Sequence, residues 1–406
     1  MVIRRTPDDF RVIERLVPAV AEQVRADRPD ARWIVFELTK RSMTTPDAVA
    51  QLARRLGVPP GACAHAGLKD KHAVTVQHVA VARARIRSAG SASDRIEAGQ
   101  WCARRIGSLD LPLASGSVEV NEFTIVLRGL NDAESAALDR RAAARADGDG
   151  VLVPNYYGSQ RFGSGRHGEG LPGERLVRGD FEGALRLAIG TPARKDSGSR
   201  RVFTRRLAAG WGAWSDVLPT LPPLPDRRAI EALSRGEPFA SAYAALPYYL
   251  QELHVDAFQS LLWNRTAARL LGRATPAELE DDPELPFPAH AQIPPEFRGL
   301  DLPALAPGVS LAEPWGDAAA SVLRRAGLAL EQLRVPGFRR PAFANFNRAL
   351  VVVARGFRAT PPEPDEAAKP RSSRPLKRTL SFQLPRGSYA TVLVEALAGR
   401  SGDPGD

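Results

Sequence analysis

The sequence predicts an α+β fold in which a mostly helical domain is inserted into a sheet domain. Three observations support this class. The first third of the 406-residue chain is rich in strand patterns, the middle is mostly helical, and strand patterns return near the end. A sheet built from both ends of a chain requires the middle to be an insertion. We therefore expect the first part of the sheet domain at residues 1–165, the insertion at 166–340 and the second part at 341–406.

Strands of the first part are predicted by alternation of apolar and polar residues and by β-branched runs. The expected strands cover residues 10–14, 33–38, 74–81, 118–120 and 123–127. Residues 45–56 carry apolar side chains at helical spacing, which predicts a helix. Thr45 is expected to cap this helix, Pro46 suits its first position, and Gly57 can end it. A second helix is expected at 133–146.

A long loop rich in Gly, Asn, Arg and aromatic residues is expected at 151–170, before the insertion. The clearest helix of the insertion is expected at 250–271. In the last part we expect strands within 348–357 and 379–384 and a final helix within 388–397. Residues 359–378 are rich in Pro, Glu, Lys and Ser, which predicts a disordered excursion between those strands.

The chain carries 56 Lys and Arg against 46 Asp and Glu, a formal net charge of +10. A surplus of this size favours a polyanionic partner, and nucleic acid is the commonest one. The alternative is a solvated basic surface without a partner. Only six of the cations are lysines, a bias typical of codon usage. Charge alone leaves both interpretations open.

Several classes of protein are disfavoured. Cys63 and Cys102 are too few for a disulfide framework or a thiolate zinc site. The spacing of His65, His72 and His78 fits no zinc motif, so no metal is expected. The N-terminus lacks the apolar core of a secretory signal, and no apolar run is long enough to span a membrane. A cytoplasmic protein is the default expectation.

Asp70 is the first candidate for chemistry. It lies between Lys69 and Lys71, just after Gly67 and before a predicted strand. Nearby positive charge lowers the pKa of a carboxyl group, so such an aspartate stays ionised and suits a nucleophile or a base. The alternative is a polar turn with a surface ion pair, worth about 0–1 kcal/mol.

The loop segment 155–163 is the second candidate. It joins Asn155, Tyr156, Gln160 and Arg161 within a few positions. Aromatic faces and an interleaved arginine can stack on bases, and side-chain amides can read base edges. The alternative is a tight loop whose aromatic side chains fill the core.

Five segments, in order, resemble the TruD family of pseudouridine synthases. The run AGLKDKHAVT at 66–75 is similar to the catalytic segment of that family. The others are PDDFRVIE at 7–14, Asn121-Glu122-Phe123, PNYYGSQRFG at 154–163 and LPRGSYAT at 384–391. The resemblance therefore covers nearly the whole chain. Tyr157 and Tyr389 stand where the family often has Phe, and both keep an aromatic ring.

The resemblance implies a mixed α/β catalytic domain built on an antiparallel sheet, with a helical insertion specific to the family. It also implies an isomerase that converts a specific uridine of RNA to pseudouridine, most often uridine 13 of bacterial tRNA. Nothing is consumed in that reaction, so neither a cofactor nor a metal is expected. The expected partner is tRNA, and no obligatory protein partner is evident.

The resemblance also implies roles for residues. Asp70 is the expected catalyst, acting on a flipped uridine as a nucleophile at the ribose or as a base. The expected substrate-binding residues are the rings of Phe10, Phe123, Tyr156 and Tyr389, the amides of Asn121, Asn155 and Gln160, and the cations Lys69, Lys71 and Arg161. Phe123 has an alternative, because the alternating run VNEFTIVL can make it a buried strand residue.

Two alternative functions stay open. The same chemistry can act on another RNA position, or the protein can be a non-catalytic RNA-binding protein or RNA chaperone. The retention of Asp70 with both flanking lysines favours an enzyme, because a degenerate relative is expected to lose the carboxylate.

Overall fold

A computed structural model describes residues 1–86, 94–165, 168–193, 196, 198–272, 293–368 and 375–398. The chain forms two compact units, one of Met1–Val153 with Val352–Asp406 and one of Pro154–Val351. The α+β class with an inserted helical part is confirmed. Among the described residues, no helix combines the length and the apolar character needed to cross a membrane.

Both expected domain boundaries, at 165/166 and at 340/341, fall inside the second unit. The reason is that the two connecting segments pair with each other there. The Asn155 backbone N–H donates to the Leu350 carbonyl at 2.9 Å, and its side-chain amide donates to the Ala349 carbonyl at 3.0 Å. Arg348 in turn donates to Asn155 Oδ1 at 2.8 Å. The first and last segments of the second unit are therefore hydrogen-bonded to each other.

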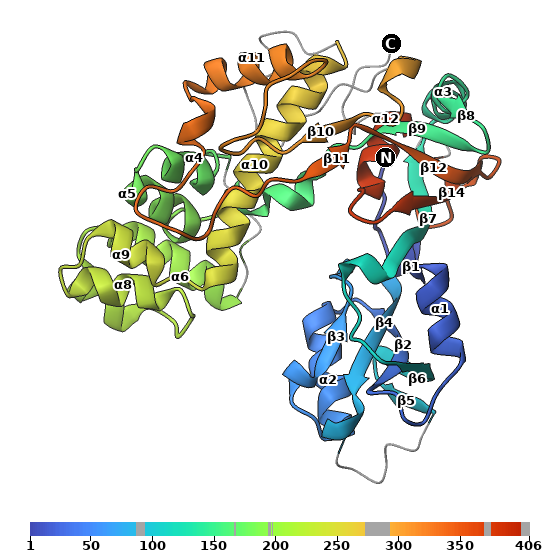
Figure 1. Cartoon of the computed structure of the whole chain (residues 1–406), viewed down its shortest axis with the longest axis horizontal. Helices are drawn as coiled ribbons and strands as arrows, with labels where there is room; N and C mark the ends of the chain where they lie inside the picture. The colour runs from blue at the N-terminus through green and yellow to red at the C-terminus, as the bar shows by residue number, and fades with distance from the viewer. Residues whose placement is uncertain are drawn as a thin grey trace. The chain divides into compact units, whose positions relative to one another are not determined.

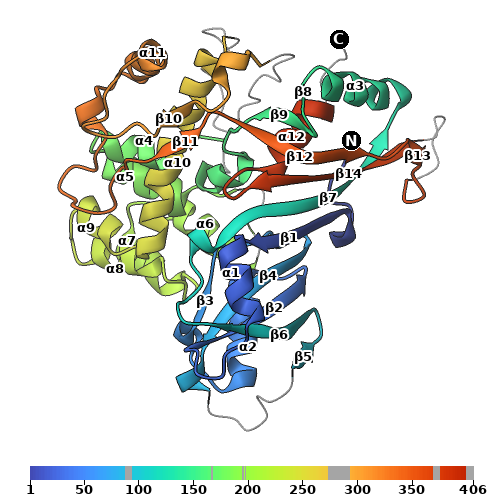
Figure 2. The same cartoon turned by 45° about the vertical axis from the view of Figure 1, so that its right-hand side comes forward.

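The first unit is built on a sheet of 12 strands within the described residues, shown in Figures 1 and 2. The strand order is β5-β6-β2-β4-β1-β7-β14-β12-β9-β8, with β3 beside β4 and β13 beside β14. The strands are β1 (Phe10–Leu16), β2 (Trp33–Arg41), β3 (Cys63–His65), β4 (Val74–Ala82), β5 (Arg95–Ala98), β6 (Trp101–Leu109), β7 (Val118–Leu130), β8 (Ala146–Asp147), β9 (Gly150–Pro154), β12 (Val351–Ala359), β13 (Glu363–Pro364) and β14 (Leu376–Pro385). β1 and β4 run parallel, whereas β1 with β7 and β7 with β14 are antiparallel.

The strands predicted at 10–14, 33–38 and 74–81 are confirmed as β1, β2 and β4. The two short runs expected at 118–120 and 123–127 are a single strand, β7. Polar residues interrupt its apolar pattern, which is why the sequence suggests two pieces. Pairing with β1 on one edge and β14 on the other satisfies the backbone of β7 through the interruption.

Four α-helices of the first unit are α1 (Pro18–Arg25), α2 (Thr45–Leu56), α3 (Asp132–Ala143) and α12 (Ala390–Ala398). The capping prediction for α2 is wrong by one residue. Thr44 is the N-cap and its hydroxyl accepts from the Asp47 N–H at 3.2 Å, whereas Thr45 is buried. Gly57 ends the helix at φ 67°, as expected. The predicted helix at 133–146 ends earlier, because residues 146–147 form β8.

The two faces of β2 and β4 are covered by different helices (Figure 1). Phe36 and Leu38 belong to the apolar cluster that includes α2, whereas Val35 belongs to the cluster that includes Val24 of α1. Side chains alternate between the faces of a strand. Lys40, two residues after Leu38, therefore faces the α2 side of the sheet.

The segment 359–378, expected to be disordered, is structured where it is described. Strand β13 pairs with β14. The Asp365 carboxylate is buried and accepts from Arg128 at 2.7 Å, while Arg128 also donates to Asp9 at 2.9 Å. This ion-pair cluster fixes the excursion to β7, so the expectation is wrong for residues 359–368 and 375–378. Residues 369–374 lie outside the described part.

Within its described residues, the second unit is helical except for one small sheet. Its α-helices are α4 (Pro172–Val177), α5 (Phe181–Leu185), α6 (Gly198–Ala209), α7 (Trp214–Val217), α8 (Arg227–Ser234), α9 (Phe239–Ala244), α10 (Tyr248–Leu270) and α11 (Gly316–Ala326), and its strands are β10 (Asp301–Pro303) and β11 (Asn347–Ala349). The helix predicted at 250–271 is confirmed as α10, which lies beside α4 and α11 (Figure 1). Phe258 and Trp263 of α10 are fully buried, so this helix forms the core of the unit.

Short 3₁₀ or π turns connect many of these elements. They are η1 (Pro7–Asp9), η2 (Pro60–Ala62), η3 (Arg83–Arg85), η5 (Ser115–Ser117), η6 (Ser159–Gly165), η7 (Arg186–Gly190), η8 (Leu218–Thr220), η10 (Pro295–Phe297) and η11 (Leu330–Gln332). Two of them concern the candidate site: η1 leads directly into β1, and η6 covers seven of the 20 residues of the loop predicted at 151–170. Residues 151–154 of that predicted loop belong instead to strand β9.

Candidate active site around Asp70

Asp70 lies on the loop between β3 and β4 in the first unit. Its carboxylate accepts a hydrogen bond from Arg4 Nη2 at 2.7 Å, and its side chain is 18% exposed. The Arg4 guanidinium also lies over the Phe10 ring, 4.2 Å from the ring centroid. The expected cationic surroundings are therefore present, and they include Arg4, which precedes β1 and contacts the carboxylate. The carboxylate is both paired and accessible.

Lys69 forms an ion pair with a different carboxylate, that of Glu14. Its ammonium pairs with Glu14 Oε2 at 2.5 Å, and the Glu14 side chain is fully buried. Glu14 Oε1 also accepts from the His78 backbone N–H at 3.0 Å and lies 3.1 Å from His78 Nδ1. Burial opposes ionisation of Glu14, but the hydrogen bonds from His78 and the Lys69 charge outweigh it, so the pKa of Glu14 lies below its ordinary value. Lys69 is thus held in an internal ion pair, and this arrangement does not favour the predicted contact with the substrate.

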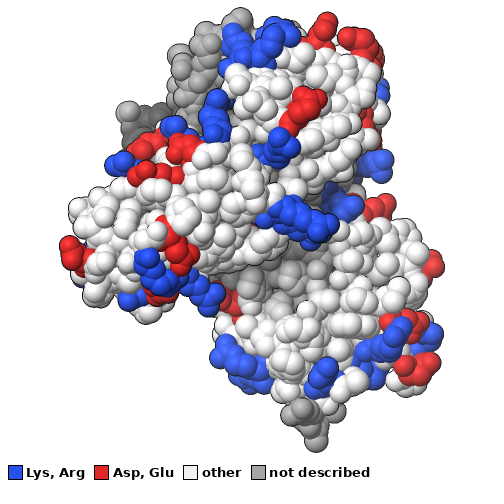
Figure 3. All heavy atoms as spheres, turned by 60° about the vertical axis from the view of Figure 1, so that its left-hand side comes forward, with Lys and Arg blue, Asp and Glu red and all other residues white. Residues whose placement is uncertain are grey.

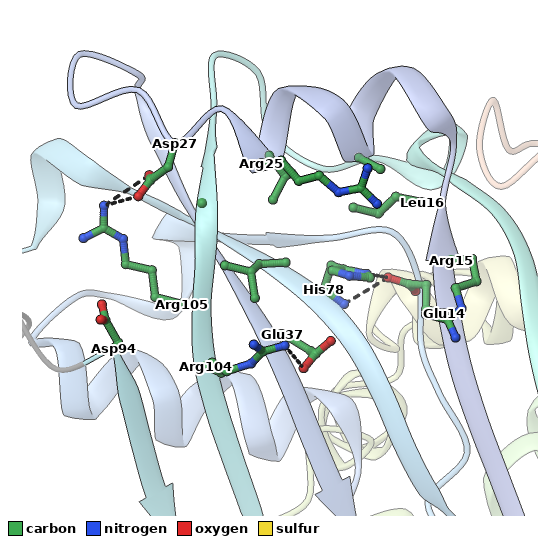
Figure 4. A pocket seen from close by; sticks show the side chains of 14 residues that line it. Glu14, Arg15, Leu16, Arg25, Asp27, Glu37, His78, Asp94, Arg104 and Arg105 are labelled. Atoms are coloured by element: carbon green, nitrogen blue, oxygen red, sulfur yellow. Dashed lines mark hydrogen bonds and ion pairs between the residues drawn. The ribbon is translucent and has the colours of Figure 1, made fainter.

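Glu14 stands where β1 and β4 cease to pair, since their parallel register ends at Ile13 and Val76. Glu14 and His78 both line a cavity of about 800 Å³ between α1 and the sheet (Figure 4). The cavity is lined by carboxylates and arginines in pairs, such as Glu37 with Arg104 at 3.0 Å. Because positive and negative side chains balance each other along its wall, the cavity does not favour the binding of an anion.

Lys71 has a different environment from Lys69. It is exposed and lines a cavity of about 250 Å³ beside the start of α2, together with Asp47 and Gln51. The two lysines that flank Asp70 in sequence therefore diverge. Lys71 is the better placed of the two to meet a phosphate from solvent.

Asn121 of β7 lies directly opposite Glu14 of β1, so the two side chains share a face of the sheet. Its Oδ1 atom is buried and accepts no hydrogen bond from the described residues. An unsatisfied buried acceptor costs about 1–3 kcal/mol and is uncommon in folded proteins. A position of this kind, beside the Glu14–Lys69 pair, is typical of a site that a ligand completes.

Phe123 is packed between two other rings. Its centroid is 5.4 Å from that of Phe382 in a stacked arrangement and 6.2 Å from that of Phe10 in an edge-on arrangement. The registers of β7 with β1 and β14 produce this row, and Phe123 is 9% exposed. The structure thus favours the alternative interpretation of a buried strand residue. Base stacking by Phe123 stays a prediction.

Tyr389 is half-buried in the turn between β14 and α12. Its carbonyl accepts the Val392 N–H at 3.1 Å at the start of that helix. β14 pairs with β7 at Leu384 and Asn121, so Tyr389 follows closely after the strand end that borders Asn121. It is the partly accessible ring among the predicted aromatic residues of this unit.

The remaining predicted residues belong to the second unit and are described within it. Asn155 and Tyr156 are buried, and burial raises the pKa of Tyr156. Arg161 is partly exposed and donates to Ser260 at 3.1 Å and to Asp256 at 3.3 Å on α10, whereas Gln160 is exposed. The loop is thus anchored on α10 through Arg161. Of the predicted set, the structure places Phe10, Lys69, Asp70, Lys71, Asn121, Phe123 and Tyr389 in the first unit.

Three residues of the site were not predicted: Arg4, Glu14 and Lys40. Lys40 is completely buried and donates to the Asp70 carbonyl at 2.8 Å. A signal for Glu14 and Lys40 exists in the sequence, because each continues the core-facing positions of an alternating strand. A charged residue at such a position is either paired or functional. No comparable signal marks Arg4. Among the described residues, no group of three or more His, Cys, Asp or Glu could hold a metal ion.

Known proteins that are similar to this chain belong to one family. The family described as tRNA pseudouridine synthase D (TruD) matches residues 1–283. The tRNA pseudouridine synthase D of Aquifex aeolicus is 29% identical over 412 residues, which cover 97% of each chain. A Halobacterium salinarum protein named "Probable tRNA pseudouridine synthase D" is 31% identical over 277 residues, covering 68% of this chain and 62% of its own.

A solved structure resembles the fold. The crystal structure of the "Putative tRNA pseudouridine synthase D (TruD)" from Methanosarcina mazei superposes with a TM-score of 0.67 at 21% identity. The match covers 98% of this chain and 93% of that one. At this identity the likeness concerns the fold, and it includes both compact units.

Proposed function

Because this chain belongs to the TruD family of tRNA pseudouridine synthases, a family of isomerases, we propose that it converts uridine 13 of tRNA to pseudouridine with Asp70 as the catalytic carboxylate. The observation that carries the assignment of Asp70 is its pairing with Arg4 at 2.7 Å while the carboxylate remains partly exposed. An ionised carboxylate that a substrate can reach meets the first requirement of a nucleophile or a base.

The reaction rearranges bonds without consuming a reactant. The bond between uracil N1 and ribose C1′ breaks, the base turns, and a bond between C5 and C1′ forms. The proton on C5 is lost and N1 gains one, so the product is an isomer of the substrate. Asp70 can attack the ribose or remove a proton from the sugar to release the base. The Arg4 hydrogen bond keeps the carboxylate oriented during either step.

The target uridine must leave its stack before Asp70 can reach it, at a cost of a few kcal/mol. Asn121 offers a partner for the flipped base. Its buried Oδ1 lacks a donor within the described residues, and uracil N3 carries an N–H. A hydrogen bond between these groups would satisfy Asn121 and would distinguish uracil from cytosine, whose N3 has no hydrogen.

The charge of the protein supports an RNA substrate. The formal net charge is +10, and Figure 3 shows several separate groups of Lys and Arg on the face drawn, some beside carboxylates. Phosphate contacts supply much of the affinity for nucleic acid and do not require a single patch. Lys71, exposed one residue after Asp70, is a phosphate contact in this proposal.

The test uses tRNA transcripts labelled with tritium at uridine C5. Incubation with the protein is expected to release one tritium per tRNA, and carbodiimide mapping of the product is expected to place pseudouridine at position 13. Pseudouridine at another position would keep the chemistry and overturn the target. Tight tRNA binding with no tritium release at any position would indicate a non-catalytic RNA-binding protein or RNA chaperone.

A further inference from the structure

We propose that Lys40 is a positioning residue for Asp70: its buried ammonium group clamps the backbone of residues 69 and 70 and thereby fixes where the Asp70 carboxylate stands. The inference rests on the proposed role of Asp70 in catalysis. It concerns a completely buried residue that contacts the backbone carbonyl of Asp70. Lys40 is buried and donates hydrogen bonds to the loop that carries Asp70, and a second side chain, that of Thr45, holds the same loop.

Lys40 is 0% exposed and lies on β2, two residues after the buried Leu38. Taking an ammonium group out of water is unfavourable unless hydrogen bonds and charges compensate. An apolar side chain would fill the same core position at lower cost. The presence of a lysine at this position is therefore best explained by the groups that its ammonium contacts.

The Lys40 ammonium has three N–H donors, and three carbonyl oxygens receive them. Two of these distances are 2.8 Å, to the Met43 and Asp70 carbonyls, and the third is 3.4 Å, to the Lys69 carbonyl. Met43 belongs to the turn before α2, whereas Lys69 and Asp70 belong to the loop before β4. One head group thus joins the end of β2, the turn before α2 and the loop that carries Asp70.

Thr45 holds the same loop from the other side. Its hydroxyl accepts the Lys69 backbone N–H at 3.0 Å and donates to Gln77 Oε1 of β4 at 2.8 Å. The N–H and the carbonyl of residue 69 and the carbonyl of residue 70 are therefore all fixed by side chains from the core. This explains how an irregular loop can present a carboxylate in a defined place.

The charge of Lys40 adds a pH dependence. Burial lowers the pKa of Lys40 to about 8, while the Asp70 charge raises it and the Lys69 charge lowers it. Asp70 is paired with Arg4, and Lys69 is paired with Glu14. These partners weaken the effects of the Asp70 and Lys69 charges on the pKa of Lys40. Below this pKa the ammonium supplies three donors. Above it the neutral amine supplies only two, facing three carbonyls, so the clamp weakens as the pH rises.

The experiment compares Lys40→Met, Lys40→Arg and a control, Lys377→Met, in the full chain. Lys377 pairs with Glu366 at 2.7 Å on the surface of the same unit, so its loss removes one lysine charge away from Asp70. Single-turnover isomerisation, tRNA affinity and amide hydrogen exchange of residues 69–73 are measured from pH 6.5 to 9.

We expect Lys40→Met to slow single turnover by about 100-fold, the effect of misplacing a reacting group by about 1 Å. Its tRNA affinity should stay within about threefold of wild type, because the phosphate contacts are untouched. Exchange at 69–73 should rise while the rest of the unit is unchanged. Lys40→Arg, which keeps a charged donor, should retain more of the rate, and Lys377→Met should match wild type throughout.

The pH dependence of the wild-type protein tests the proposal even if the Lys40 variants do not fold. Its single-turnover rate should fall, and exchange at 69–73 relative to other amides should rise, as the pH passes through about 8. The proposal would be overturned if Lys40→Met isomerised tRNA at the wild-type rate. It would also be overturned if amide exchange at residues 69–73 of Lys40→Met equalled that of the wild-type protein across this pH range. If the wild-type protein makes no pseudouridine, the proposed function fails, and the exchange data still decide whether Lys40 positions Asp70.

Discussion

Arg4 contacts the Asp70 carboxylate at 2.7 Å across a separation of 66 residues in the chain. The arginine approaches from the segment that precedes η1, and its guanidinium rests on the Phe10 ring. The ring fixes the plane of the cation, and the cation fixes one oxygen of the carboxylate. The start of the chain is thus a structural part of the candidate active site.

Replacement of Arg4 by Met should slow single-turnover isomerisation by about 10- to 100-fold, because a charge-assisted hydrogen bond worth about 1.5–3 kcal/mol is lost. Arg4→Lys should retain more activity, since it keeps the positive charge. The matched control is Arg41→Met, because Arg41 forms a comparable but exposed pair with Asp8. Equal rates for Arg4→Met and wild type would show that the contact does not serve the reaction.

Asp70→Asn should abolish isomerisation and leave the dissociation constant for tRNA nearly unchanged. The amide can neither attack the ribose nor take up a proton, whereas most of the affinity comes from phosphates elsewhere. Tritium release and filter binding measure the two quantities. Asp8→Asn, which removes an exposed carboxylate of the same unit, is the control and should be fully active. An active Asp70→Asn protein would remove Asp70 from the proposed mechanism.

Phe123→Ala should destabilise the first unit by about 3–5 kcal/mol, the usual cost of deleting a core phenylalanine. The reason is the row of rings that leaves Phe123 only 9% exposed. Urea denaturation measures the loss. Phe346→Ala, at a ring that is 40% exposed, should change stability by about 0.5 kcal/mol or less. An unchanged urea midpoint combined with slow single turnover would instead support base stacking by Phe123.

Glu14→Gln should lower the free energy of unfolding by about 3–5 kcal/mol at pH 7, because it leaves the Lys69 ammonium without its buried partner. The pKa of Glu14 is below the ordinary 4.5 in the folded protein. The stability that its ionisation contributes is therefore complete above pH 4.5 and is lost as the pH falls through the lower folded pKa.

The difference in stability between wild type and Glu14→Gln should accordingly shrink as the pH is lowered below 4.5. Urea denaturation between pH 3 and pH 7 measures it. Glu97→Gln breaks an exposed pair with Arg95 and should cost about 0–1 kcal/mol. A constant difference across this pH range would contradict the lowered pKa.

The parts of the fold that sequence patterns predict are those with a local cause. Alternation marks β1 and β2, and helical spacing with Gly57 marks α2. The cap of α2 is predicted one residue late because Thr44 and Thr45 are equivalent in sequence. Only the packed structure shows that Thr45 is turned inward to Gln77.

For the candidate site too, the sequence predicts the residues that have a local signal and misses those that are brought in by tertiary contacts. Asp70 is recognisable because its neighbours form a local motif, whereas its partner Arg4 is distant in sequence and carries no local signal. In the loop at 155–163, aromatic residues suggest base stacking, but contact with α10 determines their environment. The Tyr157 backbone N–H donates to Asn264 of α10 at 2.8 Å, and the Tyr157 ring packs edge-on against Trp263. Such tertiary contacts are not visible in a nine-residue window.

The pairing of β7 with β14 sets the order in which the site is completed during synthesis. Gln383 of β14 donates to Glu122 of β7 across 261 residues, and Phe382 supplies the ring that stacks on Phe123. At about 5–20 residues per second, a ribosome needs about 13–52 s to make the intervening chain. During that interval Arg4, Asp70 and Asn121 have all been made, but β7 has one free edge. A nascent chain therefore contains the proposed site residues before it contains the strand that pairs with the free edge of β7.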